Sequence, residues 1–207
     1  ITAAAPGTGT RAPRAFGLVD DQLWQPLGPA NLLAGQAAGS PRVSGRVRAI
    51  AVHPQGQRAY VASANGGVWA TTDGGEHWVS VAGLAPTDIA GINRPAHRNA
   101  CGALHVLWRD PPAGNELVFL GTGEIGGNRA GRTGHMEGGV GVLVADKPLA
   151  SAANTDPWVR EAGNLVNDGI YRLAGDPAGT LIVAATMTGL YQRPTAPAST
   201  ATWPLWA

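Results

Sequence analysis

Gly66-Gly-Val-Trp-Ala-Thr-Thr-Asp-Gly-Gly-Glu-His-Trp78 is the stretch of sequence that decides the fold. Val68 and Trp69 favour a β-strand, and the residues Thr71–Gly75 that follow have the composition of a tight turn. Asp73 can accept a hydrogen bond from the backbone two residues further on, and the two glycines after it adopt positive φ without strain. A second strand then begins at the final tryptophan. The stretch therefore predicts a strand, a tight turn and another strand.

The same arrangement of short strands occurs three times along the chain. Each copy reads as a strand ending in a His-Pro or Asp-Pro turn, a second strand, a strand that begins with glycine, and a strand that contains tryptophan. The turn prolines are Pro54, Pro111 and Pro177. Four antiparallel strands per unit, repeated about every 60 residues, describe the blades of a β-propeller. We expect blades at about 46–83, 103–163 and 169–207.

The predicted fold is all-β, with four-stranded antiparallel blades that stack face to face. A single blade has two apolar faces and buries them only when other blades pack on both sides. Propellers close with about 4–8 blades, so three blades indicate a fragment of a larger propeller or an incomplete ring. Residues 1–19 are rich in Ala, Pro, Gly and Thr and read as a flexible arm, whereas 20–207 form the partial propeller. The segment 23–31 is a candidate for the strand that closes the ring.

The spacing Thr71-x-Asp73-x-Gly75-x-x-Trp78 resembles the Asp-box of bacterial-neuraminidase-repeat propellers. This family includes sialidases, sortilin-like receptors, xyloglucanase-type hydrolases and photosystem-assembly propellers. His77 stands where the family usually has Ser or Thr. The resemblance implies a β-propeller in which Thr71, Asp73, Gly75 and Trp78 brace a hairpin on the outer rim of a blade, with no catalytic part.

Composition and charge exclude several classes of function. The formal net charge of +1 argues against a nucleic-acid-binding protein, which would carry a basic face. No apolar run is long enough to cross a bilayer, and the single cysteine, Cys101, cannot form an internal disulfide. Because the sequence starts at Ile1 and not at Met, we expect an exported protein, periplasmic or extracellular, with its signal removed.

One long loop carries the charged residues that could bind a ligand or a partner. The insertion from Gly126 to Gly139 and the residue just before it supply Glu124, Arg129, Arg132, His135 and Glu137. Charged loops on a rigid scaffold are common binding sites. The string Gly121-Thr-Gly-Glu-Ile-Gly126 matches the glycine pattern of a dinucleotide site, but the glycine-rich sequence after it cannot form the helix such a site needs. No histidine or cysteine spacing indicates a metal site, and we expect no cofactor.

Two functions fit these observations. The first is a non-catalytic interaction module, exported or membrane-associated, in which the loops Thr87–Ala100 and Gly126–Gly139 meet a protein partner or a glycan. We expect such a module to be an accessory subunit of a larger complex. The alternative is a glycoside hydrolase or lyase of the Asp-box propeller class that acts on a polysaccharide, for which two carboxylates would have to face a cleft about 5–10 Å apart. Asp88, Glu124, Glu137 and Asp168 are candidates, but no spacing selects a pair, so the catalytic residues stay unknown. A sialidase is disfavoured because Ile92-Asn-Arg-Pro95 lacks the aromatic and the isoleucine of the sialidase arginine segment.

Overall fold

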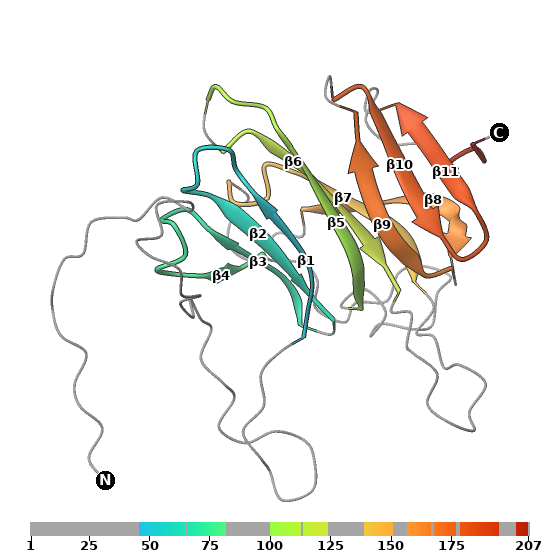
Figure 1. Cartoon of the computed structure of the whole chain (residues 1–207), viewed down its shortest axis with the longest axis horizontal. Helices are drawn as coiled ribbons and strands as arrows, with labels where there is room; N and C mark the ends of the chain where they lie inside the picture. Colours follow the sequence, from blue (N-terminus) through green and yellow to red (C-terminus); the bar gives the residue numbers. More distant parts are fainter. Residues whose placement is uncertain are drawn as a thin grey trace, which may run out of the picture.

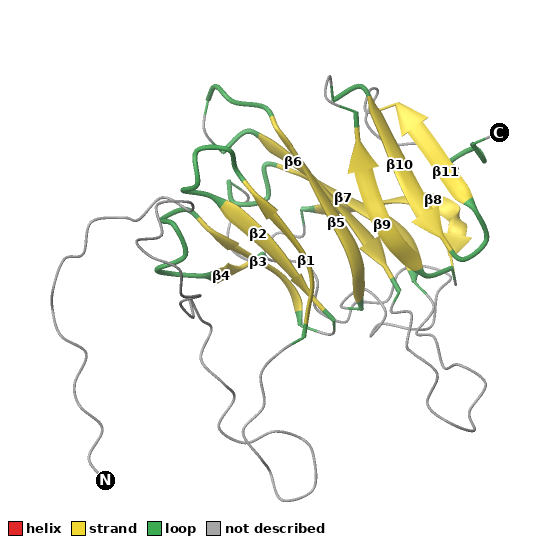
Figure 2. Cartoon of the chain, viewed as in Figure 1, coloured by secondary structure: helices red, strands yellow, loops and turns green. Residues whose placement is uncertain are grey.

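The structure is a computed structural model, and it describes residues 46–64, 66–81, 100–112, 114–123, 139–150, 157–166, 168–176, 179–194 and 202–206. Within these residues the chain forms eleven β-strands in three sheets and no helix (Figure 2). Every pair of neighbouring strands is antiparallel. The predicted all-β class is confirmed.

Each sheet follows the order of the sequence from one edge to the other, as a propeller blade does. Blade 1 contains β1 (Val47–Val52), β2 (Ala59–Ser63), β3 (Gly67–Thr71) and β4 (Val79–Ser80). Blade 2 contains β5 (Cys101–Trp108), β6 (Glu116–Thr122), β7 (Val140–Asp146) and β8 (Trp158–Val166). Blade 3 contains β9 (Ile170–Gly175), β10 (Leu181–Thr186) and β11 (Leu190–Pro194).

The segment 202–206 lies beside β11 as a short fourth strand of blade 3. The backbone N–H of Gln192 donates to the carbonyl of Pro204 at 3.0 Å, and that of Trp206 donates to the carbonyl of Leu190 at 2.8 Å. Tyr191 and Leu205 form an isolated antiparallel bridge. The tryptophan-containing strand predicted for the third copy is therefore present, although it pairs over only a few residues.

The three blades stack face to face, and two hydrophobic clusters fill the spaces between them. Figure 1 shows the sheets side by side, with their first strands β1, β5 and β9 adjacent to one another. Between blades 1 and 2 the buried cluster includes Tyr60, Val68, Leu104, Val106, Leu143 and Trp158. Between blades 2 and 3 it includes Phe119, Val142, Ile170, Leu173, Ile182 and Trp203. Face-to-face stacking of four-stranded meanders is propeller architecture, with about three blades present.

Glycines allow blades 2 and 3 to approach closely along β5, β6 and β9. A Cβ atom placed on Gly121 would lie 2.6 Å from Cγ2 of Ile170, and one on Gly102 would lie 2.2 Å from the carbonyl oxygen of the same residue. A Cβ on Gly175 would lie 2.5 Å from Nε2 of His105. Real Cβ contacts are never this short, so Gly121, the first glycine of the GxGxxG string, is explained by packing between blades.

Several expectations lie outside the described residues. They are the arm at 1–19, the segment 23–31 and nearly all of the loop Thr87–Ala100. The described residues contain no helix long and apolar enough to span a bilayer.

Candidate functional site

The predicted Asp-box forms a hydrogen-bonded turn between β3 and β4. The hydroxyl of Thr71 donates to Oδ1 of Asp73 at 2.8 Å and accepts from the backbone N–H of Gly75 at 3.0 Å. Gly74 and Gly75 have φ of 74° and 94°, so the expected positive φ values are present. Oδ1 of Asp73 also accepts from the backbone N–H of His77 at 3.0 Å. The Asp73 carboxylate thus accepts from a backbone N–H four residues ahead. The expected hydrogen bond from the Gly75 N–H to Asp73 was wrong, because that N–H donates to the Thr71 hydroxyl instead.

His77 takes part in this turn, in place of the Ser or Thr of the resembled family. Its Nδ1 lies 2.6 Å from Oδ2 of Asp73. The backbone N–H of His77, followed by the side chains of His77 and Thr71, lowers the pKa of Asp73 below its ordinary value. Asp73, Glu76 and His77 bring ligand atoms within 4.8 Å of one another. Because the Asp73 oxygens already accept three hydrogen bonds, we assign this group to the turn and not to a metal.

The β3–β4 turn is tied to the turn between β1 and β2. The backbone N–H of Gly74 donates to the carbonyl of Gln57 at 2.8 Å. In that neighbouring turn, Nδ1 of His53 accepts from the backbone N–H of Gln55 at 3.2 Å. His53 therefore has the structural turn role expected of the histidine that precedes Pro54.

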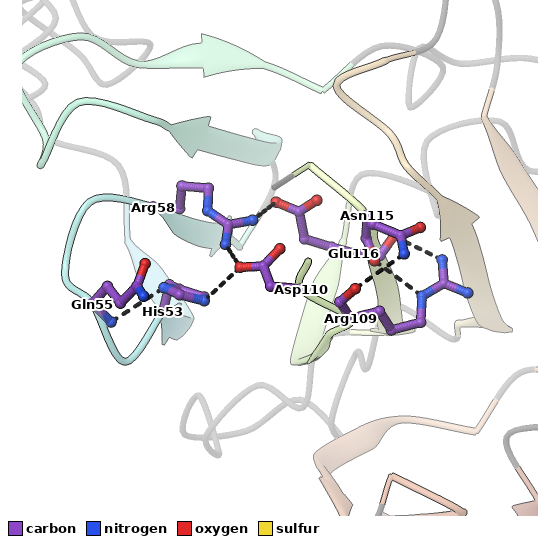
Figure 3. A network of polar contacts seen from close by, with 7 residues as sticks. All are labelled: His53, Gln55, Arg58, Arg109, Asp110, Asn115 and Glu116. Atoms are coloured by element: carbon purple, nitrogen blue, oxygen red, sulfur yellow. Dashed lines mark hydrogen bonds and ion pairs between the residues drawn. The ribbon is translucent and has the colours of Figure 1, made fainter. Parts of the chain in front are cut away.

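A network of charged side chains joins the turn ends of blades 1 and 2 (Figure 3). Arg58 at the start of β2 donates from Nη1 to Oε1 of Glu116 at 2.8 Å, and its Nη2 contacts Oδ2 of Asp110. Nε2 of His53 lies 2.9 Å from the same Asp110 oxygen. The guanidinium carbon of Arg58 stands 5.3 Å from the centroid of the Trp108 ring. Since the side chains of Arg58 and Glu116 are only 10% and 1% exposed, this is a largely buried cluster.

The protonation of His53 follows from its neighbours. Burial, together with the nearby Arg58 charge, lowers the pKa of His53, and the Glu116 charge opposes this shift only in part. Because Nδ1 accepts a hydrogen bond, the proton of the neutral ring lies on Nε2 and is donated to Asp110. Arg58 is thus the only cation within this group of four side chains.

The network forms part of the wall of an open hollow of about 880 Å³ between blades 1 and 2. The hollow is lined by Gln55, Gln57, Arg58, Thr72, Asp110, Pro111, Gly114, Glu116, Leu149 and Ala150. These residues come from the β1–β2 turn, the β3–β4 turn, the β5–β6 turn with the start of β6, and the segment that follows β7. The sequence offered no motif for this site, because its residues belong to two repeats and are far apart along the chain.

A second buried ion pair lies between blades 2 and 3. Nη2 of Arg193 donates to Oε1 of Glu161 at 2.7 Å, and Nε lies 2.7 Å from Oε2. The guanidinium carbon stands 5.4 Å from the ring centroid of Phe119 and 6.0 Å from that of Trp203. Both ionic side chains are at most 2% exposed. This bidentate pair packs inside an aromatic core and holds blades 2 and 3 together.

Asp168, one of the four carboxylates considered for catalysis, holds the hairpin between β10 and β11. Its Oδ1 accepts from the backbone N–H of Met187 at 3.1 Å, and its Oδ2 accepts from the hydroxyl of Thr188. Of the remaining candidates, Asp88, Glu124, Arg129, Arg132, His135 and Glu137 all lie outside the described residues. The proposed partner loop is thus not placed relative to the blades.

Comparison with known proteins identifies similar folds and no family. No protein-family model matches the chain, and no curated protein sequence matches it. Among solved structures, the chain is similar to the GH74 enzyme of Niastella koreensis, at 16% identity and a TM-score of 0.43 over 78% of this chain. It is also similar to an ancestral GH74 enzyme (16% identity, TM-score 0.46, 80% of this chain) and to the GH74 xyloglucanase of Xanthomonas campestris (15%, 0.46, 87%).

This likeness is one of fold alone. The chain spans 21–24% of the length of these three GH74 enzymes. At 15–16% identity no activity is transferred from them, and membership of the Asp-box family stays a prediction.

Proposed function

We propose that the chain is an interaction module whose outermost blade faces bind further β-blades. The carrying observation is an apolar face on blade 1 that nothing covers among the described residues. Val47, Ile50, Val52 and Trp69 are 55%, 58%, 40% and 38% exposed. An exposed and contiguous set of large apolar side chains is typical of an interaction surface.

The strand register places these four residues on one side of the sheet. Ile50 pairs with Val61, which pairs with Trp69, so the three side chains form a row across β1, β2 and β3. The neighbouring row, Ala51–Tyr60–Ala70, points to the opposite face and is packed against blade 2. Blade 1 therefore has two apolar faces, of which one is already buried on a blade.

The opposite end of the stack offers a smaller apolar surface. Leu190 and Trp206 of blade 3 are 47% and 48% exposed, and Leu190 belongs to the row Arg172–Ala185–Leu190, which faces away from the row Leu173–Ala184–Tyr191 that packs on blade 2. We infer that the partner is another four-stranded antiparallel blade with an aliphatic face, because the covered faces of these same sheets are buried against such blades. Covering one large apolar side chain contributes about 1.5–3 kcal/mol.

The test uses the protein itself as the probe, since blade 3 supplies a free face of the required kind. Sedimentation velocity over a range of concentrations should show self-association, and Ile50→Lys should weaken it by at least tenfold. Val159→Lys is the matched control, because Val159 is 55% exposed but lies on β8 at the outer edge of blade 2. A wild-type protein that stays monomeric, or equal effects of the two lysines, would contradict the proposal.

The second candidate is a glycoside hydrolase or lyase acting on a polysaccharide. The hollow between blades 1 and 2 favours it to the extent that two carboxylates, Asp110 and Glu116, line one open site. Both are held by Arg58, and a catalytic acid and base would have to be released from it. Release of reducing ends from xyloglucan, lost in Glu116→Gln while the fold is retained, would support this candidate. Export and a place in a larger complex also remain predictions.

A further inference from the structure

The hollow between blades 1 and 2 carries one surplus negative charge. Of the residues that line it, Asp110 and Glu116 are acidic, Arg58 is basic and the others are neutral. His53, beside Asp110, does not add a compensating positive charge, because burial and the Arg58 guanidinium lower its pKa and favour the neutral imidazole. A buried or half-buried carboxylate without full compensation favours a ligand that brings positive charge.

Glu116, one of the residues that line the hollow, also has a buried hydrogen-bond acceptor that the described residues leave unused. The Glu116 side chain is 1% exposed, and its Oε1 accepts from Arg58. Its Oε2 has no hydrogen-bond partner among the described residues. The nearby hydroxyl of Tyr60 does not fill this role, since it too is buried without a partner in the part of the chain that is described. Buried acceptors are nearly always satisfied in native proteins, so this oxygen points to a donor supplied from outside.

We propose that the hollow binds an alkylammonium group, whose N–H donors bond Oε2 of Glu116 and the exposed part of the Asp110 carboxylate. An ammonium is a compact charge with three donors on an apolar stem. Its methylene groups would lie along the apolar part of the lining, at Pro111, Leu149 and Ala150. The source of the group is a free amine or the lysine side chain of a partner.

Other ligand classes fit this site less well. An anion would meet the surplus negative charge. A divalent cation would lie beside Arg58, whose guanidinium already contacts both carboxylates. A guanidinium prefers two oxygens of one carboxylate in a plane, whereas the oxygens that no described residue bonds belong to two different residues, Glu116 and Asp110. A neutral alcohol could donate one hydrogen bond but would leave the charge uncompensated.

The experiment compares n-butylammonium with 1-butanol, which has the same carbon chain and no charge. Heteronuclear NMR titration of the whole chain should show saturable shifts around the hollow with n-butylammonium and none with 1-butanol. Asp110→Asn should weaken binding by about tenfold or more, because it removes one of two attracting charges. Glu76→Gln is the matched control, since Glu76 is an exposed carboxylate outside the hollow, and it should leave binding unchanged.

The source of the group is decided by two further probes, 1,5-diaminopentane and an Ala-Lys-Ala peptide with blocked ends. Tighter binding of the peptide indicates a lysine of a partner protein, and tighter binding of the diamine indicates a free amine. Far-ultraviolet circular dichroism confirms that Asp110→Asn is folded, and Glu116→Gln serves as the second variant if it is not. The proposal is overturned if n-butylammonium causes no saturable shifts, if 1-butanol binds equally well, or if folded variants of the two acidic residues bind as the wild type does. None of these outcomes depends on whether the exposed blade faces bind further blades, so this proposal and the proposed function can fail separately.

Discussion

Replacing Arg193 by methionine tests most directly how the blades are held together. The substitution keeps the long aliphatic stem but removes the guanidinium that satisfies both oxygens of Glu161 at 2.7 Å. The remaining carboxylate is 2% exposed and lies between blades 2 and 3. Loss of one partner from a buried ion pair costs about 3–5 kcal/mol, because an uncompensated charge stays in the core. We expect Arg193→Met to lose that much free energy of unfolding.

Two further variants separate the buried charge from general damage to the core. The double variant Glu161→Leu/Arg193→Met removes both charges, so it should be less destabilised than Arg193→Met alone, by about 2 kcal/mol or more. Arg109→Met breaks the pair with Asp146, whose side chains are 39% and 61% exposed, and should cost no more than about 1 kcal/mol.

Urea denaturation at constant pH measures all of these free energies. A cost of Arg193→Met below about 1 kcal/mol, or equal costs for the single and double variants, would refute the reasoning.

Three other predictions concern the turn, the glycine contact and the cysteine. Asp73→Ala should cost about 1–2 kcal/mol in urea denaturation at pH 7, since the turn loses its acceptor for the His77 N–H. Because the Asp73 pKa is lowered in the folded state, the difference from wild type should persist above pH about 4 and narrow as the pH falls further; a constant difference down to pH 2 would argue against it. Gly121→Ala places a methyl group 2.6 Å from Ile170, so calorimetry should show a lower Tm with a loss of about 1–3 kcal/mol, and an unchanged Tm would be the contrary result. Burial raises the pKa of Cys101 to about 12, so a thiol reagent at pH 8 should label it only as the protein unfolds, and labelling within seconds in buffer would disprove this.

Local sequence patterns predicted the elements of the fold well. The positive φ of Gly74 and Gly75 follows from the turn composition. Each copy was expected to include a strand with a tryptophan, and Trp158 and Trp203 of the second and third copies are buried between blades. These features depend on residues a few positions apart, for which turn chemistry and strand alternation are direct physical signals.

The candidate site was far less predictable. Arg58 and Glu116 are 58 positions apart and meet only because blades 1 and 2 stack in one particular register. The repeat pattern predicts that blades stack but not which side chains face each other. A charged residue at the start of an apolar strand, as in Arg58-Ala-Tyr-Val-Ala and Glu116-Leu-Val-Phe-Leu, was the one available signal. Sequence reasoning favoured instead the charged loop around His135, whose residues are not placed.

The residues between blades 2 and 3 are small at the inner strands and large at the outer strands. Gly102, Gly121 and Gly175 mark the contact of β5 and β6 with β9, where no room is left for even a methyl group. On the side of the outer strands, Trp203 fills the gap. The two sheets are therefore close together at their inner strands and farther apart at their outer strands, so the space between them is wedge-shaped. The opening angle of that wedge limits how many such sheets can complete a circle, so the ratio of glycine to tryptophan volume helps to set the curvature of any ring this chain enters.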